Sequence, residues 1–169
     1  LIDNTGGISV FSFDNTFGYT VTEGDKVNIL GTISQFNGLT EVEPDTLIFI
    51  DGGTTVKTPT EITVLNESTE SDLVSIENSL TYVDITQWLG DGSSFNVDLT
   101  DGTNTYTIRI DDANELSTMP APSNVEPFVL MVTGLGNQFD SDAPYTSGYQ
   151  LFPRYADDIE LITVLEVED

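Results

Sequence analysis

The sequence predicts an all-β protein built from two related small barrels, and three observations support this. Short runs of Thr, Val, Ile and aromatic residues alternate with Asp-Gly, Gly-Gly and Asn-Gly turns along the chain. No window of about ten residues or more carries the apolar stripe of an amphipathic helix. The third observation is an internal repeat, which sets the number of units.

The repeat is a pattern Gly-x-x-x-Gln-Phe that begins at Gly31 and again at Gly134. In each copy a later glycine, Gly38 or Gly148, opens a short alternating strand. The letters Ile-Thr-Val-Leu at 62–65 also recur at 162–165, a shift of 100 residues. Solenoid repeats are only roughly 20–50 residues long, so this repeat indicates a duplicated domain.

In the first unit, the glycines mark the bends between short strands. Gly31 lies inside a strand pattern and predicts a bulge or a barrel corner. Asn37-Gly38 predicts a hairpin, because both residues tolerate a positive φ. The polar run 66–71 indicates a domain boundary, which gives units of residues 1–67 and 68–169. The predicted strands of the first unit are 8–13, 27–33, 39–42, 47–50 and 62–65.

The second unit has enough strands to close a small barrel. Three prolines between 113 and 127 predict a loop or a short helical turn there. The first unit lacks counterparts of 73–83 and 95–99, so its barrel misses one or two N-terminal strands and exposes open edges and an apolar interior. The missing strand would come from an upstream segment or another chain, unless the chain tolerates its loss. The predicted strands of the second unit are 73–76, 80–83, 95–99, 106–110, 128–133, 149–152 and 159–165.

The chain is strongly acidic, with 29 Asp and Glu against 4 Lys and Arg, no His and a formal net charge of −25. Three interpretations stay open: solubility in salty water, binding of divalent cations, and repulsion of polyanions. Cys is absent, which excludes thiolate chemistry. No apolar run approaches the roughly 18–20 residues of a membrane span. Leu1 begins the chain without a basic signal-peptide start, which suggests a processed or excised piece.

The stretches 6–11, 22–27, 31–42 and 70–78 together resemble the OB-fold-like repeats of large secreted and surface proteins of bacteria. In that family such repeats are accessory, and they often flank extracellular nuclease domains in proteins exported by the type IX route. The resemblance implies a tandem of OB-like small β-barrels, the first lacking its N-terminal strand or strands, at an extracellular or cell-surface location. It supplies no motif of catalytic residues.

Two groups of residues are candidate binding sites. Ca²⁺ prefers loop carboxylates and carbonyl oxygens, which favours Asp111 with Asp112, and Asp140 with Asp142; the alternative is that these are solvated turn acids. Sugar or base stacking would use Trp88, Tyr145 and Tyr149, with Trp88 otherwise expected to plug the second barrel.

The basic residues are too few for a phosphate-binding groove, so nucleic acid is not an expected partner. Arg109 and Arg154 are expected to pair with Asp111, Asp157 or Asp158. Without His, Cys, a phosphate loop or a nucleophile elbow, catalysis is not expected either.

The leading functional hypothesis is therefore a non-catalytic extracellular structural or adhesive repeat module. It would join other domains of a larger surface protein, or self-associate as a fibre subunit by β-strand addition. That hypothesis uses the missing strands of the first unit and the apolar run 159–167. The alternative is a nucleic-acid- or glycan-binding module accessory to a secreted nuclease or hydrolase.

Overall fold

The computed structural model describes residues 1–13, 17–122 and 128–163. Within them, helical structure is confined to four 3₁₀ turns, η1 to η4, at Glu67–Thr69, Ile85–Gln87, Glu115–Thr118 and Ala156–Asp158. The first unit supplies β1 (Ile2–Asp3), β2 (Gly6–Gly7), β3 (Ser9–Val10), β4 (Lys26–Phe36), β5 (Leu39–Asp51) and β6 (Thr60–Glu61). The second supplies β7 (Leu73–Tyr82), β8 (Phe95–Thr100), β9 (Thr105–Ile110), β10 (Phe128–Gln138), β11 (Tyr149–Phe152) and β12 (Ile159–Thr163).

The second unit is a closed five-stranded barrel. Its strands neighbour one another in the order β7, β8, β9, β11, β10, and β10 pairs back with β7 to close the ring. β9 and β11 run parallel, whereas the other four pairings are antiparallel. A small closed barrel of five strands joined by crossover connections is the OB-like arrangement, so the predicted all-β barrel fold is confirmed.

Alternating side chains explain why this barrel forms. In β8 the apolar residues Phe95, Val97 and Leu99 are buried, while the residues between them are less so. The neighbouring strand β9 pairs antiparallel with β8 and buries Tyr106, Ile108 and Ile110 in the same way. Full burial of each large apolar side chain contributes about 1.5–3 kcal/mol. The interior is completed by Val74, Ile76, Leu80, Trp88, Leu116, Leu130, Val132 and Leu151.

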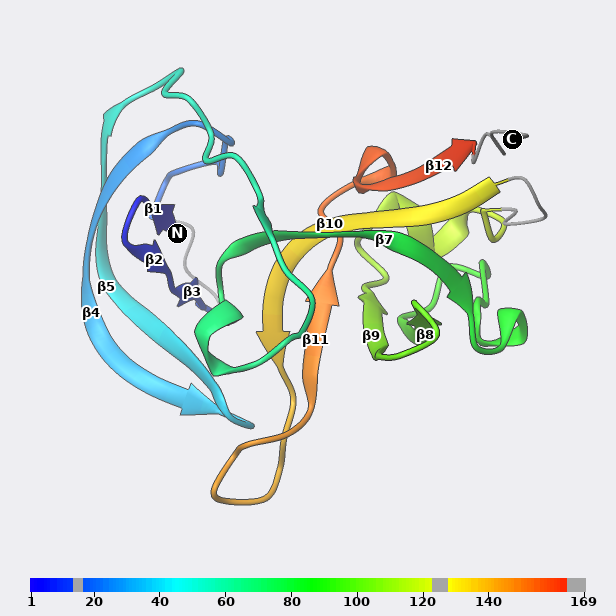
Figure 1. Ribbon diagram of the computed structural model, residues 1–169. Helices are drawn as coiled ribbons and strands as arrows, with labels where there is room; N and C mark the ends of the chain where they lie inside the picture. The colour runs from blue at the N-terminus through cyan, green and yellow to red at the C-terminus, as the bar shows by residue number, and fades with distance from the viewer. Residues whose placement is uncertain (14–16, 123–127, 164–169) are drawn as a thin grey trace.

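The first unit is an open sheet with the order β3, β5, β4. β3 runs parallel to β5, as β9 does to β11, and β4 is antiparallel to β5, as β10 is to β11. The unit thus holds three of the five barrel strands. Among the described residues, counterparts of β7 and β8 are absent from it, as the sequence predicts. Figure 1 shows β4 and β5 as a long curved hairpin around β1, β2 and the N-terminus.

The repeated glycine has the same structural role in both units. A Cβ on Gly31 would stand 2.2 Å from the Glu43 carbonyl oxygen, and one on Gly134 would stand 2.5 Å from that of Phe152. In each case the partner strand reaches a proline one residue later, Pro44 or Pro153. The pairing register shifts between Leu30 and Gly31, which confirms the predicted bulge.

The repeated glutamine closes the turn that follows it. Gln35 Nε2 donates to the Gly38 carbonyl oxygen at 2.8 Å. Gln138 Nε2 donates to the carbonyl oxygens of Tyr145 and Ser147, each at 2.8 Å. The pattern Gly-x-x-x-Gln-Phe therefore encodes a strand corner followed by a clamped turn.

Several predicted strands are joined or shortened in the structure. The segments 39–42 and 47–50 are parts of one strand, β5, which bends at Pro44 where it faces Gly31. Likewise 73–76 and 80–82 of the next predicted strand form β7, which ends one residue early at Tyr82 and has an irregular register between Ile76 and Leu80. The predicted strand 8–13 is reduced to Ser9–Val10. The predicted strand 62–65 is wrong, because those residues lie outside any strand and directly follow the short β6, Thr60–Glu61.

The segment around the predicted boundary packs against the second barrel. β6 pairs in parallel with β7, and Tyr106 Oη donates to the Thr63 carbonyl oxygen at 2.8 Å. The polar run 66–71 forms η1, with Asn66 Oδ1 accepting from the Ser68 N–H at 2.9 Å. The two units are thus joined by a structured segment.

We expect Gly31→Ala and Gly134→Ala to destabilise the folded chain by similar amounts. Each would place a methyl group against backbone, and such overpacking lowers the free energy of unfolding by about 1–3 kcal/mol. Denaturant unfolding of the two variants measures this, with Thr32→Ala as a control on an exposed residue of β4, for which the change is within about 0.5 kcal/mol. If either glycine variant is as stable as the parent chain, the conclusion that both glycines form the same close-packed strand corner is wrong.

Candidate functional site

Trp88 lies in the core of the second barrel. Only 8% of its surface is exposed, and its Nε1 donates to the Met119 carbonyl oxygen at 2.8 Å. Its ring packs edge-on against Phe95 and Tyr82, with centroids 5.3 and 6.4 Å away. The ring therefore offers no exposed face for stacking on a sugar or a base.

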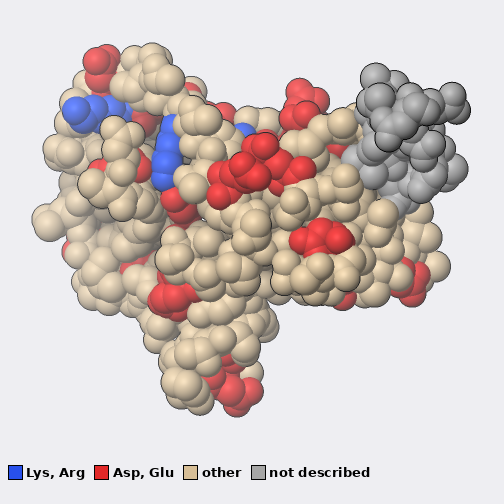
Figure 2. All heavy atoms as spheres, viewed as in Figure 1, with Lys and Arg blue, Asp and Glu red and all other residues tan. Residues whose placement is uncertain are grey.

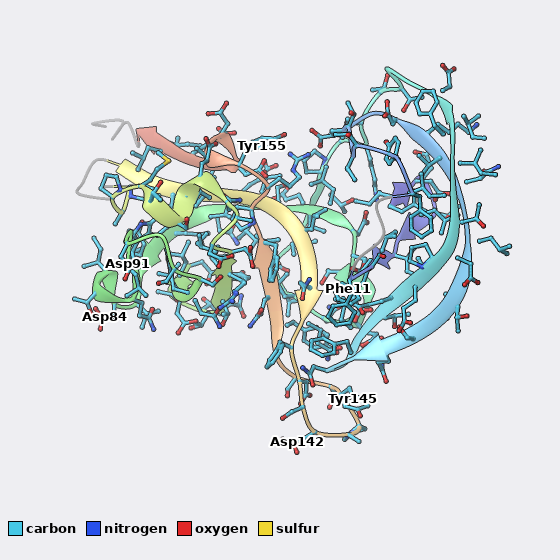
Figure 3. The ribbon with its side chains drawn as sticks, turned by 180° about the vertical axis from the view of Figure 1, so that it is seen from behind. Phe11, Asp84, Asp91, Asp142, Tyr145 and Tyr155 are labelled. Carbon is cyan, nitrogen blue, oxygen red and sulfur yellow. The ribbon has the colours of Figure 1, made fainter. Side chains whose placement is uncertain are left out.

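Tyr145 and Tyr149 belong to the loop and strand that follow β10. Tyr145 is partly buried, with its backbone in the left-handed region at a φ of 59°. Figure 3 shows Tyr145 and Asp142 in the loop between β10 and β11, far from Asp84 and Asp91. Tyr149 donates from Oη to Glu67 Oε2 at 3.2 Å, across the junction between the units. The structure thus places these tyrosines away from the buried Trp88.

Asp140 organises this loop. Its Oδ1 accepts from the Asp142 N–H at 3.0 Å, and its Oδ2 accepts from the N–H and hydroxyl of Ser147 at 3.0 and 2.8 Å. The Asp142 N–H and then the Ser147 hydroxyl are the main causes that lower the Asp140 pKa. Both carboxylate oxygens are therefore already acceptors within their own loop.

The other predicted metal ligands, Asp111, Asp112 and Asp142, are exposed. Asp111 Oδ1 accepts from the Ala113 N–H at 3.1 Å, as turn aspartates commonly do. Within residues 1–13, 17–122 and 128–163, no three acidic side chains gather as a metal-binding group. Calcium binding stays a prediction. Its candidate ligands lie in two separate loops, one with Asp111 and Asp112 and the other with Asp140 and Asp142.

Two of the four basic residues are held in ion pairs. Arg154 donates from Nη2 to Asp158 Oδ1 at 2.9 Å and also pairs with Glu23 of the first unit. Lys57 lies 2.6 Å from the Asp72 carboxylate. The predicted Arg154–Asp158 pair is thus present, whereas Arg109 donates to the Asn96 amide oxygen at 3.3 Å. Figure 2 shows carboxylates scattered over one face and basic groups at only a few places.

Two cavities in the described part of the chain are small. One of about 230 Å³ is bounded by β7, β10 and β12, and another of about 200 Å³ lies beside Tyr106 and Tyr149. Both volumes fall below the roughly 300–1,000 Å³ that is typical of small-molecule sites.

The feature that stands out is the apolar surface of the first unit. Leu30, Ile33 and Phe36 of β4 expose 71%, 63% and 59% of their surface. Further exposed apolar residues lie on β5 and in the segment after β3, and they are Ile48, Phe49, Ile50, Phe11 and Phe13. Figure 3 shows Phe11 on the concave side of the β4–β5 hairpin. In the second barrel the counterpart strand β10 has β7 paired along the equivalent edge.

The edge of β4 is also unusual in charge. The strand Lys26–Phe36 has 11 residues, and Lys26 is its only charged side chain. Its hairpin partner β5 carries Glu41, Glu43, Asp45 and Asp51. Edge strands are normally protected by charges, prolines or bulges, and among the described residues β4 pairs with β5 alone. The predicted open edge is therefore a long, nearly neutral strand with one unpaired side.

Comparison with protein-family models, with curated proteins and with solved structures found no match. The resemblance to secreted bacterial repeats is thus a prediction. Across the described residues, no helix is both long and apolar enough to cross a membrane.

Asp101 gives a prediction about pH. The N–H groups of Asn104 and Thr103 donate to its carboxylate and lower its pKa to about 2, from 3.8. A lowered carboxyl pKa stabilises the folded state above the unfolded pKa, and this stabilisation is lost as the pH falls from about 4 to about 2. Asp101→Asn should therefore lower the melting temperature by a few degrees at pH 7 and by much less near pH 2.

Circular dichroism melts between pH 2 and pH 7 measure this difference. The exposed Asp112→Asn is the control, since it removes the same charge from a neighbouring turn of the same barrel. If the difference in melting temperature between Asp101→Asn and the parent chain does not narrow as the pH falls, the lowered pKa of Asp101 does not stabilise the fold as described.

The calcium prediction has a direct measurement. An ion that binds only the folded chain raises its apparent stability, by about 2.7 kcal/mol at 100 times the dissociation constant. If either pair of aspartates binds Ca²⁺, the melting temperature rises in millimolar Ca²⁺ relative to a chelator. Asp142→Asn or Asp112→Asn should abolish that rise, and an unchanged melting temperature in the parent chain would refute calcium binding.

Proposed function

We propose that this chain is a non-catalytic structural module of an extracellular or surface-displayed protein, and that it assembles through the unpaired edge of its first unit. Assembly would occur by β-strand addition, in which a foreign strand pairs with β4. The observation that carries the proposal is the open sheet β3-β5-β4, next to a complete barrel of related sequence.

The exposed apolar residues supply the driving force for such assembly. A strand laid on β4 would pair backbone groups that otherwise face solvent, and would cover Leu30 and Ile33. Removing apolar surface from water contributes roughly 25 cal/mol per Å². An open apolar strand edge is also an aggregation hazard, so a defined occupant provides a reason to retain it.

The acidic surface fits the same role. At physiological salt the Debye length is about 8 Å, so a net charge of −25 keeps copies apart at long range and leaves short-range pairing possible. Specific edge pairing is thereby favoured over non-specific collapse.

The proposal is tested by filling the edge from within the molecule. We expect the parent chain to form oligomers whose mass in light scattering grows with concentration. Fusing a second copy of residues 73–82 to the N-terminus through a flexible linker should give a monomer with a higher melting temperature, because the added strand completes the sheet.

The matched control is the same fusion with aspartate in place of Val74 and Ile76 in the added copy only. It should assemble like the parent chain. A parent chain that stays monomeric at all concentrations and salt strengths would overturn the proposal.

A further inference from the structure

We infer that the occupant of the β4 edge is β12 of a second copy of this chain, added antiparallel and head to tail. The inference rests on the proposed function and names its partner. Both strands are terminal in their sheets: β12 ends the seven-stranded sheet and β4 ends the three-stranded one. Each copy therefore carries a donor edge and an acceptor edge at different places on its surface.

The second barrel shows what an occupant of the acceptor edge looks like. There Leu73, Val74 and Ser75 of β7 lie opposite Leu135, Gly134 and Thr133 of β10. Because Gly31 and Gly134 form the same corner, the corresponding positions on β4 are Thr32, Gly31 and Leu30. The edge should thus accept a strand that reads leucine, a β-branched apolar residue, then a hydroxyl residue.

β12 carries that pattern. Its residues Leu161, Ile162 and Thr163 match Leu73, Val74 and Ser75 in kind and in order. Leu161 is the distinctive residue, since 46% of its surface is exposed. In the first unit the corresponding position is Glu61, in β6, which pairs with β7 inside the same molecule.

The faces of the two sheets agree with this pairing. Leu161 lies opposite the buried Leu130, so it is on the face of β12 that turns toward its own barrel. Alternation places Ile162 on the other face. Set opposite Gly31, Ile162 would enter the concave side of the neighbour's half-barrel, as Val74 enters the second barrel. Leu161 would then lie diagonal to the exposed Leu30 of the neighbour.

The charges of the two strands also permit this pairing. β4 carries Lys26 and no acidic residue, and the only charged residue of β12 is Glu160. Repulsion between the remaining acids of the two copies is screened by salt, with a Debye length that falls from about 10 Å at 0.1 M to 3 Å at 1 M. Assembly should therefore strengthen as salt rises. Since the donor and acceptor edges differ, the contact is heterologous and extends into filaments unless it closes into a ring.

The test uses one variant for each edge in the full chain. Leu161→Glu gives the donor strand β12 the glutamate that the first unit has at the corresponding position, Glu61. Leu30→Glu places a carboxylate on the acceptor edge of β4. Each variant alone should be monomeric in light scattering at concentrations where the parent chain forms oligomers. The control is Val83→Glu, which adds the same charge at an exposed apolar site away from both edges and should assemble like the parent chain.

Mixing the two variants decides the geometry. An equimolar mixture of Leu161→Glu and Leu30→Glu should form a one-to-one dimer and stop there, because only one donor edge and one acceptor edge remain intact. Circular dichroism melts check that each variant is folded. Formation of the dimer in the mixture would itself show that neither variant is monomeric because it is misfolded.

The outcomes separate this inference from the proposed function. Oligomers that persist in Leu161→Glu and dissociate in Leu30→Glu would overturn β12 as the donor and leave edge assembly standing. A mixture that stays monomeric would overturn the head-to-tail arrangement. A parent chain without oligomers at any salt concentration would overturn both the inference and the proposed function.

Discussion

Backbone pairing along β10 is the interaction on which the rest of the structure depends. This one strand pairs with β11, with β12 and, across the closure of the barrel, with β7. It can do so because it bends at Gly134, where a side chain would meet the backbone of Phe152. Closing the ring leaves β10 without an unpaired edge over its central residues, and Leu130 and Val132 are buried as a result. The counterpart strand β4 has the same corner but, in the described part of the chain, pairs with β5 alone, which accounts for the different exposure of the two units.

The architecture could be predicted from the sequence to a useful degree. Turn residues and alternating apolar residues identified the β class, and the repeated glycine and glutamine identified the duplication and the missing strands. Each of these signals is local, or compares one stretch with another. The bulge at Gly31 was predictable for the same reason, since a glycine within a strand pattern marks a bend.

Strand continuity and side-chain environment were harder to predict. The sequence predicted 39–42 and 47–50 as separate strands, yet β5 continues from one to the other because Pro44 lies at the bulge facing Gly31. Trp88 could be a core residue or a binding platform from sequence alone, and the choice depends on Phe95, Tyr82 and Met119, which are distant in the chain. The same holds for Asp140, because its loop brings Ser147 to the carboxylate. Sequence patterns report residue types, and these outcomes depend on which neighbours the fold supplies.

The junction between the two units has a mechanical consequence. Phe36 and Phe139, the last residues of the repeated pattern, meet edge-on with ring centroids 6.3 Å apart, and the Asp140 N–H donates to the Asn37 carbonyl oxygen at 2.6 Å. Glu70 accepts from the Thr40 N–H at 2.8 Å, and Lys57 pairs with Asp72. These contacts lie at several points along the junction, so pulling the two units apart would have to break all of them. The two units therefore resist separation through these contacts as well as through the chain that links them.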